Sequence, residues 1–310
     1  MEKISVIGTG TMGHSIALTI AWANLPVIVY GLDDDEIQKA IEGIQNKTEM
    51  LKENQILDEN KTKQIIEHIR FSKDLEAAVS EATFIIEAAP ENLELKQKLF
   101  KELEQFCTKD TILASNSSSL PPTKIAQNLQ YPQRVLGTHF WNPAHLLPLV
   151  EIIKGEKTEH IFIERARDLM IRINKQPILV NKEVVGFVGN RLQFALFREA
   201  QHLYETEVAS IHDIDTAVQL SIGRRLGITG PFMTADLGGL DIFKSISDYT
   251  FSDLSNQEAA SDTINQFVHE GHLGEKSGKG YYEWEERFSK EMKQKREAEL
   301  IRWLKKDAKK

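Results

Sequence analysis

The chain has 310 residues and a formal net charge of −8, and 27% of its residues are charged. At about 150 residues per domain, this length predicts two domains. The mildly acidic composition excludes a general affinity for nucleic-acid backbones or anionic membranes, because both depend on clustered Lys and Arg. The single cysteine, Cys107, excludes an internal disulfide and a multi-cysteine zinc site, and no apolar run reaches the roughly 18 residues of a membrane helix. We expect a cytoplasmic protein without a metal site.

The first thirty residues predict a nucleotide-binding unit. A short apolar run at Ile4–Ile7 predicts a buried strand, and the glycine-rich segment at residues 8–13 predicts a tight turn. Apolar residues then recur at helical spacing until Pro26, and Val27–Tyr30 predicts a second strand. Strand, glycine turn, helix and strand in this order are typical of a mononucleotide-binding fold.

The following segments predict the rest of a sheet. Residues 34 to about 70 are helical in pattern with a break at residues 55–60, which predicts a helical pair. Short apolar runs then alternate with helical patterns, and this alternation predicts an α/β domain with a doubly wound, mostly parallel sheet of the Rossmann type. Further strands are expected at residues 83–86, 111–114, 134–138, 148–153 and 176–180, and an amphipathic helix at residues 92–106.

The strand patterns stop after Gly186. Apolar residues at helical spacing predict helices over residues 187–203 and 211–220, and therefore an all-helical second domain. We accordingly divide the chain into a nucleotide-binding domain, a helical domain and a charged tail helix that is expected to be mainly solvated. Their bounds are residues 1–184, 185–284 and 285–310.

The glycine-rich turn carries the first chemical signal. Gly8, Gly10 and Gly13 match the G-x-G-x-x-G pattern directly after a strand and before a helix. The first glycine allows the tight turn, the second lets the backbone approach a pyrophosphate, and the third lets the helix pack on the strand. Thr11 and Met12 complete the expected contact set. The alternative is that the glycines serve the turn alone.

The same pattern expects an acidic residue about 20 residues further on, where it binds a ribose diol. Position 31 is a glycine here, and Asp33 begins an acidic run that extends to Glu36, with no Lys or Arg before Lys39. Such a run repels a 2′-phosphate, which favours NAD over NADP. We take Asp33 as the candidate ribose ligand, with helix capping as the alternative role of the run.

A second constellation consists of His139 and, twelve residues later, Glu151. Oxidation of an alcohol needs a base with a pKa near neutrality, which histidine supplies. A carboxylate bonded to the other ring nitrogen fixes the tautomer and stabilises the imidazolium, and we assign this role to Glu151. Taken singly, the two residues could instead be a structural histidine and a solvated charge.

Two further segments contain candidate ligand-binding groups. The serine loop at residues 115–119 follows a buried strand and could face a ligand, although it could also only cap a helix. Asn190 lies where the second domain begins, so a cleft between the domains would bring it to the site.

In this order, these residues resemble the L-3-hydroxyacyl-CoA dehydrogenase family from Lys3 to about Trp284. The matching pieces are Gly8 to Gly13, Glu91-Asn92-Leu93 with Lys96, Ser115 to Leu120, His139 to Pro143, Leu149-Val150-Glu151, Gly186 to Leu192, Gly230-Pro231-Phe232, and Gly278 to Tyr282.

The resemblance implies a role for each matching residue. His139 is expected to be the catalytic base and Glu151 its orienting partner, and a homodimer is expected to form through the helical domain. Ser118 and Asn190 are expected to hydrogen-bond the substrate. The NAD contacts are expected from Glu91, Lys96, Ser118, Asn142 and Lys276.

Three positions depart from the family's usual pattern. Gly31 replaces the ribose-binding acid, Pro148 stands where lysine is usual, and Arg225 has no counterpart in the acyl-CoA enzymes. The last two are similar to a related branch that uses free hydroxy acids, including L-carnitine dehydrogenase and the L-gulonate dehydrogenase that resembles lambda-crystallin. A buried Arg225 would suit a substrate carboxylate, because a guanidinium can hold two oxygens at once.

The residues and the resemblance together predict an enzyme of fatty acid metabolism. It would oxidise the hydroxyl of an L-3-hydroxyacyl-CoA reversibly to the 3-oxoacyl-CoA, with NAD as cofactor. The alternative is the same chemistry on a free 3-hydroxy acid such as L-carnitine or L-gulonate, with Arg225 binding the substrate. A more distant alternative is a non-catalytic NAD-binding structural protein.

Overall fold

The computed structural model describes residues 2–308 and divides into two compact units. The first contains the described residues up to Asn190 together with those from Glu297 onward, and the second contains Arg191–Arg296. The first unit therefore extends past the predicted domain end at residue 184, and it includes the last part of the segment that was expected to form a separate tail.

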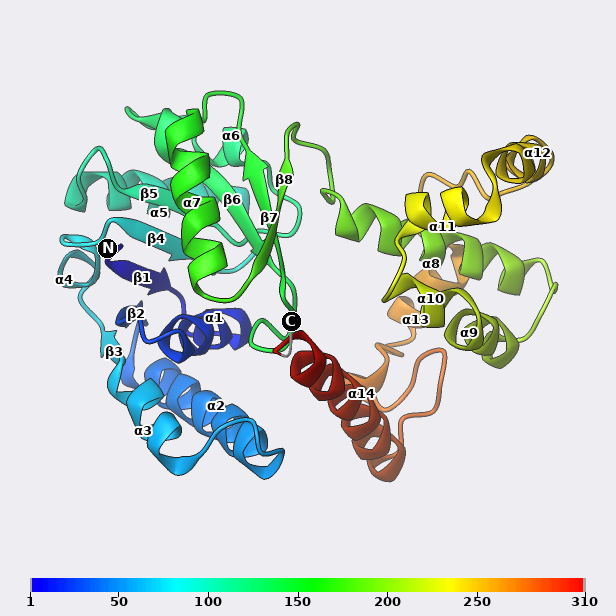
Figure 1. The fold of residues 1–310 in the computed structure, drawn as a ribbon, viewed down its shortest axis with the longest axis horizontal. Helices are drawn as coiled ribbons and strands as arrows, with labels where there is room; N and C mark the ends of the chain where they lie inside the picture. The colour runs from blue at the N-terminus through cyan, green and yellow to red at the C-terminus, as the bar shows by residue number, and fades with distance from the viewer. Residues whose placement is uncertain (1, 309–310) are drawn as a thin grey trace. The chain divides into compact units, whose positions relative to one another are not determined.

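The first unit is built on one eight-stranded sheet with the order β3-β2-β1-β4-β5-β6-β7-β8 (Figure 1). All neighbouring strands are parallel except β6 and β7, which confirms the predicted doubly wound, mostly parallel sheet. The strands are β1 (Ile4–Ile7), β2 (Val27–Tyr30), β3 (Ile69–Ser72), β4 (Phe84–Glu87), β5 (Ile112–Ser115), β6 (Val135–Phe140), β7 (Leu149–Lys154) and β8 (Gln176–Val180).

Helices cover both faces of this sheet, because side chains along a strand point alternately to its two sides. On β4, Phe84 and Ile86 belong to one buried cluster and Ile85 to the other. The first cluster is covered by α1 (Thr11–Trp22), α2 (Asp34–Glu53), α3 (Glu59–Glu67) and α7 (His160–Arg172). The second is covered by α4 (Leu75–Val79), α5 (Leu93–Phe106) and α6 (Pro122–Ile125).

The second unit is helical, as predicted. Its helices are α8 (Gly189–Glu205), which begins at the end of the first unit, α9 (Ile211–Leu220), α10 (Ile222–Leu226), α11 (Pro231–Gly238), α12 (Leu240–Thr250) and α13 (Asp262–His269). An aromatic cluster around Tyr281 organises it, since the ring of Tyr281 meets Phe197, Tyr204 and Phe267 edge-on. Gln201 of α8 donates a 3.1 Å hydrogen bond to the Tyr281 hydroxyl.

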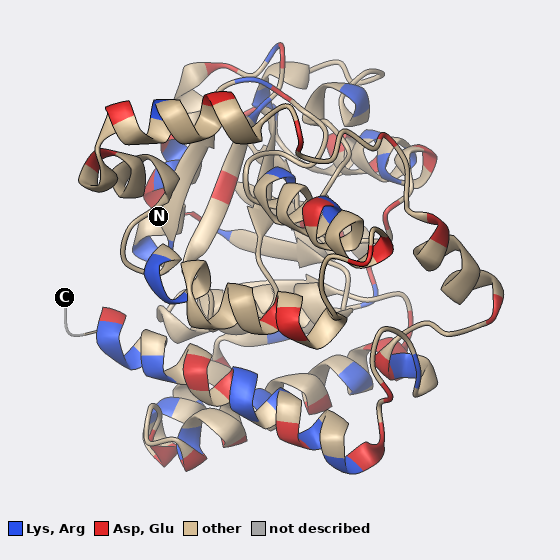
Figure 2. Cartoon of the chain, turned by 90° about the vertical axis from the view of Figure 1, so that its right-hand side faces the viewer, with Lys and Arg blue, Asp and Glu red and all other residues tan. Residues whose placement is uncertain are grey.

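The final helix, α14 (Glu286–Asp307), belongs in part to each unit. Acidic and basic residues alternate along it (Figure 2). Its last turns are nevertheless not a solvated tail, because Ile301 is buried in the core of the first unit and Leu300 and Leu304 pack against the same cluster. The spacing of these three residues forms an apolar stripe on an otherwise charged helix. None of the helices within residues 2–308 is long and apolar enough to span a membrane.

Candidate active site

The glycine-rich loop fits a bound dinucleotide. Gly8 has a φ of +113°, and a Cβ there would lie 2.8 Å from the Ala88 carbonyl oxygen. A Cβ at Gly13 would lie 2.0 Å from the Gly8 oxygen, so α1 can approach the loop only because this residue is glycine. At Gly10 a Cβ would meet nothing within 4 Å, which leaves open space for a pyrophosphate.

Three N–H groups are available at this point. Within residues 2–308, the backbone N–H groups of Gly10, Thr11 and Met12 have no protein acceptor. Free N–H groups at a helix N-terminus attract an anion. The residues present therefore suit the pyrophosphate of NAD, and these three are the ones that would hold it.

The acidic run begins α2. Asp33 is the N-cap, and its Oδ1 accepts a 2.8 Å hydrogen bond from the Glu36 N–H. Glu36 in turn accepts hydrogen bonds from the Leu32 N–H and the Thr9 hydroxyl. A Cβ at Gly31 would lie 2.7 Å from Thr9 Cγ2, so a larger residue at this position would require the Thr9 side chain to move. Asp33 is exposed, and a ribose contact from it stays a prediction.

His139 and Glu151 are brought together by the antiparallel pairing of β6 and β7, in which they face each other. His139 Nδ1 lies 2.7 Å from Glu151 Oε2, and both side chains are buried. The other carboxylate oxygen accepts hydrogen bonds from the N–H groups of Val188 (2.9 Å) and Gly189 (3.0 Å). These two groups were not predicted from the sequence.

The electrostatics of the pair favour an ionised Glu151. Burial raises the pKa of its carboxyl, but the hydrogen bonds from His139 and from the two backbone N–H groups outweigh burial and hold the pKa below its usual value. The carboxylate then accepts the Nδ1 proton of a neutral His139. This leaves Nε2 with a lone pair, as a general base requires.

Aromatic rings surround the imidazole of His139. The ring centroid of Trp141 lies 5.6 Å away and that of Phe187 lies 5.8 Å away. A Cβ at Gly189 would lie 2.3 Å from Trp141 Cζ2, so the glycine makes room for the indole. The Gly186 to Arg191 segment thus contributes both an aromatic neighbour and the N–H groups that orient Glu151.

Lys96, an expected NAD contact, has an internal position. Its ammonium is buried and donates hydrogen bonds to Glu87 Oε1 (2.5 Å) and to the Ala89 carbonyl (3.1 Å). Glu87, which is also buried, accepts a 2.6 Å hydrogen bond from the Ser115 hydroxyl. Lys96 therefore supports the loops after β4 and β5, and a contact between its ammonium and NAD stays a prediction.

Glu91 holds the serine loop. Its Oε1 accepts hydrogen bonds from the Ser117 hydroxyl (2.5 Å) and from the N–H of Ser119 (3.1 Å). Burial raises the pKa of Glu91, and these hydrogen bonds reverse that effect, so the pKa lies below its usual value. Ser118 is exposed, and its carbonyl oxygen lies 3.4 Å from Asn190 Nδ2. The predicted substrate-binding residues Ser118 and Asn190 are therefore neighbours.

The remaining predicted contacts are exposed. Asn142 follows Trp141 in the turn after β6. Lys276 lies in a short 3₁₀ helix of the second unit. Arg225 lies in α10 and is exposed, which corrects the expectation of a buried arginine, because α10 is a short helix with no buried residue.

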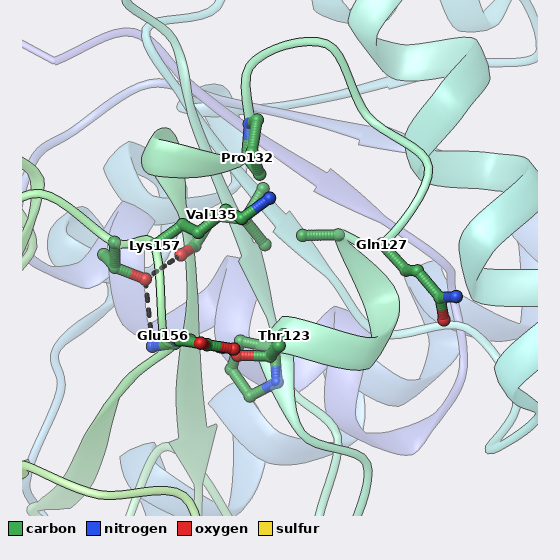
Figure 3. Close-up of a pocket in the computed structure, with 10 residues that line it drawn as sticks. Thr123, Gln127, Pro132, Val135, Glu156 and Lys157 are labelled. Carbon is green, nitrogen blue, oxygen red and sulfur yellow. Dashed lines mark hydrogen bonds between the residues drawn. The ribbon is translucent and has the colours of Figure 1, made fainter.

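A separate pocket of about 160 Å³ lies at the opposite end of β6 (Figure 3). Val135, the first residue of β6, lines it, whereas His139 lies near the other end of that strand. Thr123, Pro132 and Glu156 complete part of the wall. The pocket is therefore not part of the His139 site. No three His, Cys, Asp or Glu side chains within residues 2–308 are grouped as a metal site would need.

The fold, the glycine loop and the cofactor-domain match together define an NAD-binding oxidoreductase. Residues 3–184 match the family model described as 3-hydroxyacyl-CoA dehydrogenase, NAD binding domain, and residues 186–284 match the C-terminal domain of the same family. The chain belongs to the 3-hydroxyacyl-CoA dehydrogenase family, as its motifs predicted, and NAD is its cofactor.

Several relatives are named for different activities. The 5-formyl-3-hydroxy-2-methylpyridine 4-carboxylate 5-dehydrogenase of Mesorhizobium japonicum is 34% identical, covering 97% of this chain and 96% of that protein. A crystal structure of an enzyme with this activity, described as an NAD+ dependent dismutase, matches 98% of this chain and 99% of its own with a TM-score of 0.91 and 34% identity. A probable 3-hydroxybutyryl-CoA dehydrogenase of Bacillus subtilis is 35% identical, covering 93% and 99%. The L-carnitine dehydrogenase of Oceanobacillus iheyensis is 35% identical, covering 77% and 76%.

Proposed function

We propose that the protein oxidises a substrate hydroxyl to a carbonyl, with His139 as the general base. The observation that carries this proposal is the 2.7 Å contact between His139 Nδ1 and the Glu151 carboxylate, which leaves Nε2 free to act. When bound, NAD supplies the hydride acceptor. His139 Nε2 takes the hydroxyl proton, and the resulting imidazolium is stabilised by the negative charge of Glu151. In the reverse direction the imidazolium returns the proton to the carbonyl oxygen.

An L-3-hydroxyacyl-CoA is the substrate class that the family membership favours. Ser118 and Asn190, whose side chains come from neighbouring segments, would bind the hydroxyl or the thioester carbonyl. Support comes from the match to both family domains and from the Bacillus subtilis relative. Fatty acid metabolism and a cytoplasmic location stay predictions.

A small free carboxylate is the second candidate, and specific observations favour it. Pro148 and Arg225 are the departures that resemble the branch that uses free hydroxy acids, and Arg225 could still bind a carboxylate although it is exposed and not buried. The alignment with the pyridine-carboxylate dehydrogenase spans 301 residues and so continues beyond residue 284, where the family model ends. A hydrated aldehyde presents the same H–C–O–H group as an alcohol, so the same base serves both substrates.

One experiment separates the two substrate classes. NADH absorbance is followed with acetoacetyl-CoA, L-carnitine, L-gulonate and 5-formyl-3-hydroxy-2-methylpyridine-4-carboxylate side by side. Turnover of acetoacetyl-CoA alone supports the acyl-CoA proposal, and turnover of a free acid alone supports the second candidate. Failure of every substrate, with NADH still bound, contradicts the proposed chemistry for both.

Arg225→Met sharpens the result, and Arg224→Met on the same short helix is its matched control. If Arg225 binds a substrate carboxylate, its loss should lower kcat/KM on that acid about ten- to a hundredfold, because charge-assisted hydrogen bonds are worth roughly 1.5 to 3 kcal/mol. Arg224→Met should change it little. An equal loss in both variants, or in neither, removes this role from Arg225.

The acidic run should set the cofactor preference. We expect NADH to be preferred over NADPH by at least about tenfold, or roughly 1.4 kcal/mol. Asp33→Asn keeps a capping side chain and removes the charge, whereas Asp33→Ala removes both. If Asp33 binds the ribose, both variants weaken NADH binding; if it only caps α2, the Asn variant binds normally.

We further propose that a second copy of the chain covers the apolar face of the helical unit. Large apolar side chains there are more than half exposed, among them Phe232, Leu237, Leu240, Tyr249 and Phe251. Isolated monomers seldom expose so much apolar surface. Sedimentation equilibrium should show a dimer, and Phe232→Glu should weaken it. A wild-type monomer at micromolar concentration contradicts the proposal.

A further inference from the structure

His14, in the first turns of α1, is buried directly behind the glycine-rich loop. Its Nδ1 lies 3.0 Å from the Thr9 carbonyl oxygen, and its Nε2 lies 2.7 Å from Lys47 Nζ on α2. A carbonyl oxygen can only accept, so Nδ1 carries the proton and Nε2 accepts from Lys47. Burial lowers the pKa of His14, and nearby Lys47 lowers it further, which keeps the ring neutral.

The neighbouring helix is shaped to receive this ring. A Cβ at Gly43 of α2 would lie 2.6 Å from His14 Nε2 and 2.8 Å from Cε1. Glycine inside a helix is less favourable than alanine by roughly 1 kcal/mol. Glycine at position 43 therefore makes α2 less stable but leaves space for the imidazole of His14. Lys47, one turn later on α2, hydrogen-bonds the ring.

The contact with Thr9 decides where the next N–H group points. The Thr9–Gly10 peptide is trans, so its C=O and N–H point in opposite directions. His14 holds the carbonyl toward the protein, and the Thr9 hydroxyl is anchored on Glu36. The Gly10 N–H then points to the open side of the loop, where it has no acceptor among residues 2–308.

We propose that His14, supported by Lys47 and by the space at Gly43, is a positioning residue that aims the Gly10 N–H at the pyrophosphate of NAD. The inference rests on the expected placement of the pyrophosphate at Gly10. His14 itself does not touch the cofactor, because its two ring nitrogens are both occupied by protein atoms.

The test compares two variants that both lose the Lys47 contact. His14→Leu fills the space without a donor, whereas His14→Asn places an amide N–H where Nδ1 lies and can still bond the Thr9 carbonyl. NADH binding is measured by fluorescence titration of the full-length protein. We expect about a tenfold weaker Kd for His14→Leu, the effect of one misdirected hydrogen bond to a charged group, and a Kd within about twofold of wild type for His14→Asn. The matched surface control is His160→Leu, at an exposed histidine of α7.

Two further measurements separate positioning from general damage. ADP-ribose, which contains the pyrophosphate, should lose affinity for His14→Leu by the same factor as NADH, whereas adenosine should not; both are measured by displacement of NADH. Gly43→Ala leaves His14 unchanged in sequence but displaces its ring, because the added Cβ would lie 2.6 Å from Nε2. This variant should reproduce the losses seen with His14→Leu, and it replaces His14→Leu in the test if that variant does not fold. Equal losses for ADP-ribose and adenosine, or equal losses for the Leu and Asn variants, overturn the inference. Failure of the wild-type protein to bind NADH would instead contradict NAD as its cofactor.

Discussion

His139 and His145 lie in the same segment of the chain and are equally buried, each with 5% of its surface exposed, yet their surroundings are opposite. Nδ1 of His139 meets the carboxylate of Glu151 at 2.7 Å. Nδ1 of His145 meets only the Ser15 hydroxyl at 2.9 Å, and its buried Nε2 has no partner within residues 2–308.

Burial, reinforced by nearby positive charges, keeps His145 unprotonated. Burial lowers its pKa to about 3, and Lys47 and Lys175 add to the effect. Lys175 is itself buried, with its pKa lowered to about 8 by desolvation, and it donates to the carbonyls of Ala144 and Leu147. Burial alone therefore does not make a histidine a base at neutral pH. The two buried rings differ in what faces Nδ1, which is the Glu151 carboxylate for His139 and the uncharged Ser15 hydroxyl for His145.

The largest effect is expected for His139→Ala, which tests whether His139, unlike His145, acts as a base. Loss of a general base typically costs 10²- to 10⁴-fold in rate, so we expect kcat to fall about a thousandfold while NADH binding is retained. Turnover at saturating substrate and NADH titration measure the two properties. A loss below about tenfold would show that His139 is not the base.

Glu151→Gln tests the partner of the pair. The amide oxygen of glutamine can still accept from Val188 and Gly189, so the local backbone is kept while the negative charge is removed. We expect kcat to fall about a hundredfold, because the imidazolium loses its counter-charge. Circular dichroism of the variant should be unchanged. Near-normal turnover would make Glu151 a structural residue.

His145→Gln tests the opposite environment through acid stability. In the native protein His145 stays neutral down to its pKa of about 3, while in the unfolded chain it binds a proton below the usual histidine pKa of 6.5. The unfolded state therefore gains a proton first, and stability is lost as the pH falls from 6.5 toward 3. Between pH 6.5 and 4.5 this amounts to about 2 to 3 kcal/mol. Urea unfolding should show that the variant is less acid-sensitive by this amount, with turnover at pH 7.5 retained; identical pH slopes would contradict this environment for His145.

Ser15→Ala has the smallest expected effect. The substitution removes the hydroxyl that is the partner of His145 Nδ1. Unlike Glu151→Gln, which alters the partner of His139, it removes no charge. We expect a loss of about 1 to 2 kcal/mol in the free energy of unfolding and unchanged kcat. If kcat instead fell as far as in Glu151→Gln, the distinction between the two histidines would fail.

The elements that were best predicted from the sequence are those with a strong pattern of apolar residues. The buried strands and the long helices stand within a few residues of their predicted positions, because apolar runs and caps such as Asn92 mark them. The edge strand β3 was missed. Its residues Arg70 and Ser72 interrupt the apolar run, and a strand that pairs on only one side does not need a continuous one.

The site was predictable only where side chains carry the signal. The antiparallel pairing of β6 and β7 brings His139 to Glu151, and the order of the motifs identified both residues. The N–H groups of Val188 and Gly189 have no signature in any residue type, since every residue except proline carries one. For Lys96 the resemblance implied a contact with NAD, whereas the structure pairs its ammonium with Glu87, an acid at the end of a buried strand. Glu87 could have indicated the buried position of Lys96, because a buried carboxylate needs a charged or hydrogen-bonding partner.

The return of α14 to the first unit has a consequence for biosynthesis. The hydrophobic core around α1 includes Ile301, which the ribosome adds only after the whole helical unit has been made. The first unit can begin to collapse early, but it closes its core only after the second unit has been synthesised. During translation the nascent chain therefore carries an apolar patch that its own last helix later covers, and chaperones that recognise such patches have their longest access to the protein there.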